Sequence, residues 1–218
     1  SVPMAFGLLI GSAVYGAVAV GSHDDAQQQR QLRVAVVQTN VPQSNKDSSS
    51  PQQRRDNFEG MMRLVRQAAE SDPKPDLIVC PETMTPRPIN AEFIDRYKNL
   101  DEHEARDLRE ALLAFCKQHK VHLIVGAHAV GEYGPSADDP ERVIPHRRHN
   151  AAYCISPQGR IIGRYDKMHL VPIGEYLPGV NVIPFFKSIL MAISPYREEY
   201  TLVPGFGVEA FEITTESN

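Results

Sequence analysis

Short apolar runs alternate with helical patterns along this chain, and the alternation restricts the fold more than any other feature. The runs at 32–38, 77–80 and 121–130 have the apolar character of buried strands in a parallel sheet. The segments at 54–70 and 104–119 carry apolar residues at helical spacing. A strand, a helix and a second strand in this order form a right-handed crossover with parallel pairing. The sequence therefore predicts an α/β fold.

The remaining segments add strands and less regular stretches to this prediction. A strand is predicted at 147–156, where a turn at 157–159 begins a hairpin, and a further strand is predicted at 206–213. The long polar excursion at 131–146 is expected to be an insertion at a rim or a lid. The apolar stretch at 182–192 favours an exposed flap that meets lipid, with an ordinary core helix as the alternative.

The N-terminal stretch from Val2 to Gly21 contains no charged side chain. About twenty apolar residues are enough for a helix to cross the hydrocarbon core of a bilayer. We therefore interpret residues 1–21 as a transmembrane helix and the polar residues 22–31 as a linker. A secretory signal segment and a buried soluble helix are the two alternatives.

Composition excludes several classes of function. The formal net charge of -4 gives no general argument for binding nucleic acid. The three cysteines, Cys80, Cys116 and Cys154, form no CxxC pair, which argues against a disulfide framework and against a zinc site. Because the sequence begins at Ser1 rather than at a methionine, we expect it to be a piece of a longer protein.

Two segments carry the candidate functional side chains. The run DLIVCPE at 76–82 reads as a short buried strand that ends in Glu82, at the edge where α/β sheets collect functional groups. The run RIIGRYDKMHLVPIGEYLPG at 160–179 places Lys167 and Glu175 in a Pro- and Gly-punctuated segment after a strand. The alternative is that Glu82 caps the following segment and that Lys167 and Glu175 form a surface pair of small energetic value.

The combination of VCPET with YDKMHLVPIGEYLP resembles the nitrilase-like (carbon-nitrogen hydrolase) superfamily. Within that superfamily, HLVPIGEYLP is similar to the extracytoplasmic domain of the apolipoprotein N-acyltransferases. The resemblance runs from about Leu32 to near the end of the chain. It implies an α-β-β-α sandwich, present at 32–218 as an incomplete, N-terminal part, preceded by one transmembrane helix that is the last of a membrane bundle.

The resemblance also implies roles for individual residues. Glu82 would be the general base, Lys167 would stabilise an oxyanion, and Glu175 would support the lysine and the nucleophile. His169 and Tyr176, in the same run as Lys167, are candidates for contact with substrate. No metal ion or cofactor is implied.

The nucleophile is the one part of the implied machinery that the sequence does not supply. In the resembling family it is a cysteine in a Cys-Tyr-Glu-like segment beyond the lysine. No such segment occurs between Lys167 and Asn218. Cys80, Cys116 and Cys154 are expected to be buried thiols rather than nucleophiles. We therefore expect the chain to stop before its catalytic cysteine.

The implied reaction moves a fatty acyl chain from a phospholipid to the N-terminal amine of a diacylglyceryl-cysteine apolipoprotein. Its partners would be the phospholipid donor, the apolipoprotein acceptor and the bilayer, without nucleic acid. The implied location is the bacterial inner membrane, with the nitrilase-like domain on the extracytoplasmic side. The alternatives are an amidase that hydrolyses small amides and a non-catalytic membrane-anchored module. Dependence of activity on phospholipid separates the acyltransferase from the amidase.

Overall fold

The chain forms two compact units, Ser1–Leu32 and Arg33–Asn218, and each is described by itself. The computed structural model describes residues 2–24, 32–41, 50–96, 103–135, 141, 143–172, 174–176 and 201–214. The predicted flap or helix at 182–192 lies outside these residues, as does most of the predicted linker at 22–31.

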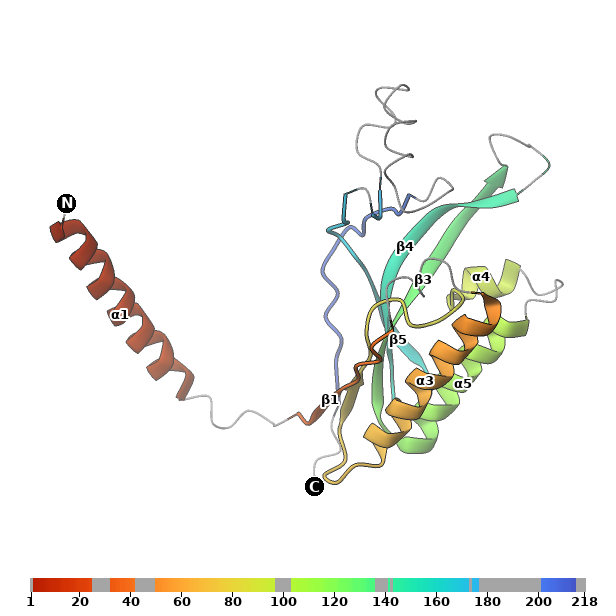
Figure 1. The fold of residues 1–218 in the computed structure, drawn as a ribbon, viewed down its shortest axis with the longest axis horizontal. Helices are drawn as coiled ribbons and strands as arrows, with labels where there is room; N and C mark the ends of the chain where they lie inside the picture. Colours follow the sequence, from red (N-terminus) through yellow and green to blue (C-terminus); the bar gives the residue numbers. More distant parts are fainter. Residues whose placement is uncertain are drawn as a thin grey trace. The chain divides into compact units, whose positions relative to one another are not determined.

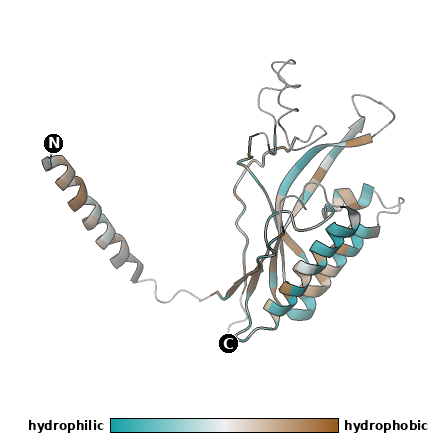
Figure 2. Cartoon of the chain, viewed as in Figure 1, coloured by the Kyte–Doolittle hydropathy of each residue, from teal (hydrophilic) through white to brown (hydrophobic). Residues whose placement is uncertain are grey.

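The first unit contains helix α1, Val2–Asp24. The helix predicted at 1–21 is therefore present, and it ends at Asp24, inside the segment that we predicted to be a linker. In Figure 2, α1 has little of the teal that marks hydrophilic residues. Across the described ranges, none of the helices combines the length and the apolar character that crossing a membrane requires. The structure thus shows the predicted helix and does not show a membrane span.

The second unit is built on one mixed sheet with the strand order β1-β2-β3-β4-β5 (Figure 1). β1, β2 and β3 pair in parallel, as the crossover pattern predicts, whereas β3, β4 and β5 pair antiparallel through two hairpins. The strands are β1 Val34–Val36, β2 Leu77–Val79, β3 His122–Pro135, β4 Val143–Ile155 and β5 Ile161–Asp166. The described part is an α/β fold, as predicted.

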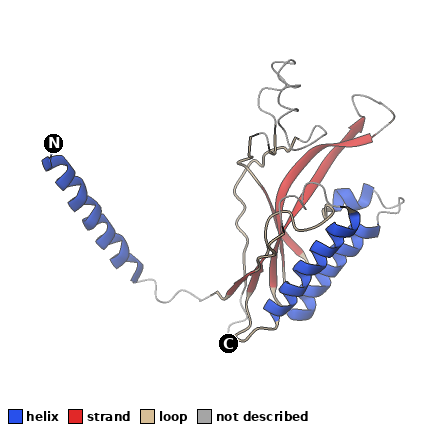
Figure 3. Cartoon of the chain, in the orientation of Figure 1, coloured by secondary structure: helices blue, strands red, loops and turns tan. Residues whose placement is uncertain are grey.

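The described part of this unit contains three helices: α3 Pro51–Ala69, α4 Ala91–Arg96 and α5 His103–His119. α3 begins where Ser50 caps it, because the Ser50 side chain accepts a hydrogen bond from the Gln53 N–H, and Pro51 suits the first helical turn. α3 and α5 lie side by side against the sheet (Figure 3), and Arg55 of α3 pairs with Glu104 of α5. The short helix α4 was not predicted.

The core lies between these two helices and the sheet. β3 contributes alternate residues to it, and the apolar faces of α3 and α5 are buried as their spacing predicts. In Figure 2 the opposite sides of both helices are mostly teal. The residues of α3 and α5 that are buried in this main cluster are Phe58, Met61, Met62, Val65, Ala69, Leu112, Phe115 and Cys116.

The prediction that the run at 32–38 forms a buried strand is wrong as to its burial. Val34 and Val36 of β1 are 47% and 77% exposed. β1 stands at the end of the strand order and pairs within the described sheet with β2 alone. The apolar character of this segment therefore predicted a strand correctly, but it did not predict how much of that strand is exposed.

Two further segments differ from their predicted structure. The described residues of the polar excursion at 131–146 are mostly strand, because β3 continues to Pro135 and β4 begins at Val143, with partners such as Tyr133 and Pro145 in register. Polar residues are tolerated there because the hairpin's strands are exposed near its end. The excursion's place at a rim or its action as a lid stays a prediction. Residues 206–213 form no strand, although Gly205 donates a backbone hydrogen bond to the carbonyl of Lys167.

Candidate active site

Glu82 lies just beyond the C-terminal end of β2. The backbone of its loop is attached to β3, because the Cys80 N–H donates to the carbonyl of Ile124 and the Met84 N–H donates to the carbonyl of Gly126, each at 2.8 Å. Strand β2 and these two hydrogen bonds fix the backbone on both sides of Glu82. The carboxylate therefore stands where we predicted it, at the carboxyl edge of the parallel strands.

Gly126 is what lets the Glu82 loop lie this close to β3. A Cβ atom at Gly126 would stand 2.6 Å from both the Pro81 carbonyl oxygen and the Thr83 nitrogen, and 2.8 Å from the Glu82 Cα. These are backbone atoms that no rotamer change can move. A glycine within a strand commonly marks such a close approach of two backbones.

Lys167 directly follows β5. Its N–H donates to the carbonyl of Asn150 at 2.8 Å, which extends the pairing of β4 with β5 by one residue. Its carbonyl accepts a hydrogen bond of 3.0 Å from the Gly205 N–H. The lysine backbone is therefore held on both sides.

Glu175 lies in a tight turn that its own side chain helps to close. The Glu175 N–H donates to the Val171 carbonyl, and the Val171 N–H donates to Oε2 of Glu175, each at 2.8 Å. The carbonyl of Glu175 accepts a hydrogen bond of 2.7 Å from the Leu202 N–H. One carboxylate oxygen is thus committed to the loop, and the other faces the lysine.

The structure brings Glu82, Lys167 and Glu175 together. Nζ of Lys167 lies 3.1 Å from Oε1 of Glu82 and 3.0 Å from Oε1 of Glu175. The exposed fractions of these side chains are 55% for Glu82, 29% for Lys167 and 14% for Glu175. The surface-pair alternative does not describe this geometry, because the lysine is shared between two carboxylates from separate loops and one of them is largely buried.

Charge and burial act in opposite directions on two of these groups. Burial raises the pKa of Glu175, but the hydrogen bonds that it accepts from Val171, Asn150 and Lys167 outweigh burial and hold that pKa below its ordinary value. Burial lowers the pKa of Lys167, but its hydrogen bonds to Glu175 and Glu82 outweigh burial and raise that pKa. The ammonium and the Glu175 carboxylate are therefore both ionised near neutral pH.

Sequence reasoning missed Asn150 of β4. Its Nδ2 donates hydrogen bonds to Oε1 of Glu82 and to Oε1 of Glu175, the second at 2.9 Å. The signal in the sequence was an amide at the start of the otherwise apolar run NAAYCI, since a buried amide needs hydrogen-bond partners.

His169 and Tyr176 are less closely associated with the three charged residues. His169 is exposed, and Tyr176 is half-buried beside Glu175, where it forms an isolated bridge with Pro172. Among the described residues, neither side chain forms a hydrogen bond with Glu82, Lys167 or Glu175. Their predicted contact with substrate stays a prediction.

The three cysteines are buried, free thiols. Burial raises the pKa of Cys80 and of Cys116 to about 12, and that of Cys154 to about 11. A thiol with so high a pKa is scarcely ionised near neutral pH, and the thiolate is the nucleophilic form. None of the three has the properties of a catalytic nucleophile.

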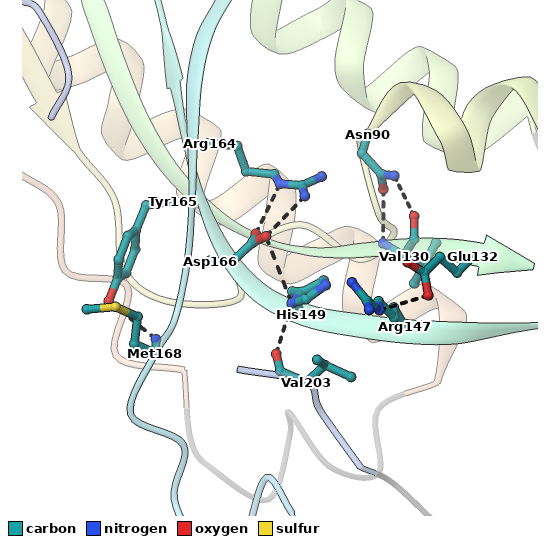
Figure 4. A network of polar contacts seen from close by, with 10 residues as sticks. All are labelled: Asn90, Val130, Glu132, Arg147, His149, Arg164, Tyr165, Asp166, Met168 and Val203. Atoms are coloured by element: carbon teal, nitrogen blue, oxygen red, sulfur yellow. Dashed lines mark hydrogen bonds and ion pairs between the residues drawn. The ribbon is translucent and has the colours of Figure 1, made fainter. Parts of the chain in front are cut away.

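A second polar network holds the backbone of residues 201–205 in place. Nδ1 of His149 donates to the carbonyl of Val203 at 2.9 Å and lies 3.9 Å from Oδ2 of Asp166, which Arg164 contacts at 3.0 Å (Figure 4). A Cβ atom at Gly205 would collide with the Asp166 carbonyl group. Residues 201–205 are therefore fixed against β4, β5 and the turn that carries Glu175.

Comparison with known proteins gives one family. Residues 33–206 match the family model described as Carbon-nitrogen hydrolase. An Apolipoprotein N-acyltransferase of Geobacter metallireducens is 33% identical over 167 residues, which cover 76% of this chain and 27% of that protein. Another, of Brucella suis, is 33% identical over 175 residues, which cover 80% of this chain and 27% of that protein. The chain thus spans about a quarter of the length of these curated relatives (27%).

Two solved structures are more distant in sequence than these relatives. A carbon-nitrogen hydrolase from Helicobacter pylori G27 is 23% identical with a TM-score of 0.39, over 64% of this chain and 40% of that chain. An amidase from Nesterenkonia sp. is 17% identical with a TM-score of 0.40, over 81% of this chain and 49% of that chain.

Proposed function

This chain belongs to the carbon-nitrogen hydrolase family, and on that premise we propose that its protein is an N-acyltransferase that matures lipoproteins. The enzyme moves a fatty acyl chain from a phospholipid to the N-terminal amine of a diacylglyceryl-cysteine apolipoprotein. The observation that carries the proposal is Lys167, whose ammonium lies within hydrogen-bond distance of Glu82 and of Glu175. Relatives named Apolipoprotein N-acyltransferase support the choice of reaction within the family.

In the first step, a cysteine from outside these 218 residues attacks the ester carbonyl of the phospholipid. Glu82 takes the thiol proton as the carbon–sulfur bond forms. An ammonium N–H of Lys167 stabilises the oxyanion. The ester carbon–oxygen bond then breaks, and the departing lysophospholipid oxygen takes the proton from Glu82. The product is an acyl thioester.

In the second step, the amine of the apolipoprotein attacks the thioester carbonyl. The carbon–nitrogen bond forms, Glu82 accepts the amine proton, and Lys167 again faces the oxyanion. The carbon–sulfur bond breaks, and the thiolate recovers the proton from Glu82. Glu175 takes no proton in this scheme; it holds the lysine.

Both proposed substrates carry acyl chains, so we place the enzyme at the bacterial inner membrane, with the unit at 33–218 on the extracytoplasmic side. The support is on α1, whose large apolar side chains are 54–77% exposed, a surface that suits lipid better than water. The proposal needs α1 to associate with lipid and does not need it to span the bilayer. These side chains are Met4, Phe6, Leu8, Leu9, Ile10, Val14, Tyr15 and Val18.

The test uses the full-length enzyme and a phospholipid with a labelled acyl chain. We expect Glu82→Gln and Lys167→Ala to abolish detectable thioester formation, because each removes a group that contacts the reacting atoms. Glu59→Gln and Lys74→Ala, on exposed residues, are the matched controls and should leave it unchanged. Robust thioester formation by either site variant would contradict the proposal.

An amidase is the second candidate, because Glu82 is 55% exposed and a small amide can reach it from water. The same base and oxyanion group would serve amide hydrolysis. Assaying the full-length enzyme on small amides, with and without phospholipid vesicles, separates the two. Amide hydrolysis that is independent of lipid, without acyl transfer to a diacylglyceryl peptide, would favour the amidase.

A further inference from the structure

Asn150 contacts all three of the charged site residues. It lies on β4 and is 5% exposed. Its carbonyl accepts the backbone N–H of Lys167 at 2.8 Å. Its side-chain Nδ2 donates to Oε1 of Glu82 and to Oε1 of Glu175. One buried residue therefore fixes the backbone of the lysine and the side chains of both glutamates.

The chemistry of the partners determines the orientation of the Asn150 amide. Ionised carboxylates only accept hydrogen bonds, so the amide nitrogen rather than the amide oxygen must face them. The nitrogen carries two N–H groups, and the structure gives one to Glu82 and one to Glu175. Rotation of the amide by 180° would break both hydrogen bonds and would place the Asn150 amide oxygen against the Oε1 atoms of the two carboxylates.

These hydrogen bonds address a problem of charge. Two carboxylates share one ammonium at Lys167. His128 of β3 pairs with Asn150 and also faces both carboxylates, but burial lowers its pKa, so it adds little positive charge near neutral pH. Negative charge is therefore in excess among these groups, and like charges at short range disfavour the ionised forms. A hydrogen bond to a carboxylate favours its ionised form. The Asn150 amide provides this to Glu82 and Glu175 without adding charge of its own.

The same hydrogen bonds leave two groups available for chemistry. An ammonium has three N–H groups, and those of Lys167 that contact Glu82 and Glu175 leave one for an oxyanion. Oε2 of Glu82 accepts no hydrogen bond from the described residues. The hydrogen bonds from Lys167 and Asn150 go to the Oε1 atoms of Glu82 and Glu175. The third N–H of Lys167 and Oε2 of Glu82 therefore stay available for the proposed reaction.

We propose that Asn150 is a positioning residue of the active site, which holds Glu82 and Glu175 together at Lys167 so that the base and the oxyanion group keep their places. The inference rests on the covalent chemistry of the proposed function. It does not depend on which acyl donor or acceptor the enzyme uses.

The experiment measures the rate at which iodoacetamide labels the nucleophilic cysteine of the full-length enzyme as a function of pH. Peptide mass spectrometry identifies that cysteine and separates it from the three buried thiols. For Asn150→Asp we expect the acidic limb of the profile to move up by about one pH unit or more, which is about a tenfold loss of rate on that limb. For Asn150→Ala we expect a smaller shift in the same direction, because two hydrogen bonds are lost and no charge is added.

Asn90→Ala is the matched control. Asn90 is 4% exposed, and its side-chain amide forms hydrogen bonds with Glu92 and with the backbone of Val130 in β3. The Asn90→Ala change therefore removes a buried amide that lies outside the site. We expect it to lower the thermal stability and to leave the midpoint of the acidic limb unchanged. The positioning role is overturned if both Asn150 variants resemble this control, with a lower folded fraction and an unshifted profile. If Asn150→Asp does not fold, Asn150→Ala alone decides the question.

Two further measurements separate failure of this inference from failure of the proposed function. If Glu82→Gln suppresses labelling while both Asn150 variants leave the profile unshifted, only the role of Asn150 is lost. If Glu82→Gln has no effect on labelling, the proposed covalent chemistry is lost, and this inference is lost with it. If the Asn150 variants shift the profile but the enzyme does not transfer acyl chains, the positioning role of Asn150 would be supported and the proposed substrates would be contradicted.

Discussion

Glu82 and Glu175 offer the same functional group to the same lysine, but their surroundings differ. Glu175 is 14% exposed, and both of its carboxylate oxygens accept hydrogen bonds, one of them from its own turn. Glu82 is 55% exposed and uses only Oε1 within the described part of the chain. The two loops reach Lys167 from different parts of the sequence, one after β2 and one after β5.

In the proposed mechanism, this difference suits two chemically equal residues to different tasks. A carboxylate with both oxygens occupied is committed to structure, because taking a proton would cost it hydrogen bonds. A carboxylate with one open oxygen can accept a proton while its other oxygen keeps it in place. Glu82 therefore suits the base, and Glu175 suits the support of Lys167.

The largest expected effect separates activity from stability at these two positions. Glu82→Gln should lower the rate of acyl transfer about 10²–10⁴-fold, as expected for loss of a general base. Because Glu82 is more than half exposed and the Oε1 of a glutamine can still accept from Asn150, the same change should alter the free energy of unfolding by about 1 kcal/mol or less. Kinetics and thermal denaturation of the full-length enzyme measure the two quantities. A large loss of stability in Glu82→Gln would remove the distinction between the two glutamates.

The next largest effect is expected for Gly126→Ala, which should displace the loop that carries Glu82 and leave the turn that carries Glu175 in place. In Gly126→Ala, the new Cβ must displace the backbone of the Glu82 loop. Misplacement of a catalytic group by about 1 Å can cost roughly 10²-fold in rate, and strain of this kind costs about 1–3 kcal/mol in stability. The atoms nearest to the new Cβ all belong to the Glu82 loop, so Lys167 and Glu175 should remain paired.

Gly60→Ala is the matched control, and its stability should change in the opposite direction. Gly60 lies within α3, where a new Cβ meets only the end of the Arg63 side chain at 3.6 Å. Alanine should stabilise that helix by up to about 1 kcal/mol and leave the rate unchanged. If Gly126→Ala retained full activity, the Glu82 loop would not depend on close approach to β3.

Much of the fold could be predicted because its signals are local. The apolar spacing of α3 and α5 determines which faces are buried, and the turn at 157–159 determines the β4–β5 hairpin. β1 and the end of the β3–β4 hairpin were described wrongly because the exposure of a strand depends on neighbours that its own residues do not encode. The same holds for 206–213, whose backbone pairs with no strand in the part of the chain that the structure describes.

The site was predictable only in part. Glu82, Lys167 and Glu175 were chosen because the runs that carry them resemble a known family, and the structure places the three side chains together. Their catalytic roles stay predictions. Asn150 could not be found in that way, because its importance arises from a register that sets β4 beside β5 and places its amide between two loops. Gly126 was missed for the same reason, since a close backbone approach is a property of packing.

A smaller effect depends on pH and concerns Glu175. Its pKa is lower in the folded chain than the ordinary value of 4.5, so its contribution to stability is complete above that value and is lost as the pH falls through the folded pKa. At about pH 7, Glu175→Gln should lower the free energy of unfolding by about 1–3 kcal/mol, because charge-assisted hydrogen bonds are lost. Below pH 4.5 the difference between the two proteins should shrink.

Lys167 determines how the free energy of unfolding changes at high pH in the same measurement. Its pKa is raised above 10.5, so its contribution is complete below that value and is lost as the pH rises through the folded pKa. Thermal denaturation of the full-length protein and of Glu175→Gln across pH would show both limbs. A difference between the two proteins that stays constant well below pH 4.5 would mean that Glu175 acts through packing rather than through charge.

The smallest effect comes from an ion pair that resembles the site pair only in its distance. Arg147 and Glu132 lie 2.8 Å apart near the end of the β3–β4 hairpin (Figure 4), with side chains 44% and 60% exposed. Exposed pairs contribute about 0.2–1 kcal/mol, so a double-mutant cycle with Arg147→Gln and Glu132→Gln should give a coupling energy in that range that weakens with salt. The cycle for Lys167 and Glu175 should give a larger coupling, because Glu175 is 14% exposed and its lysine 29%. Equal couplings would show that burial does not distinguish the site from the surface of the same sheet.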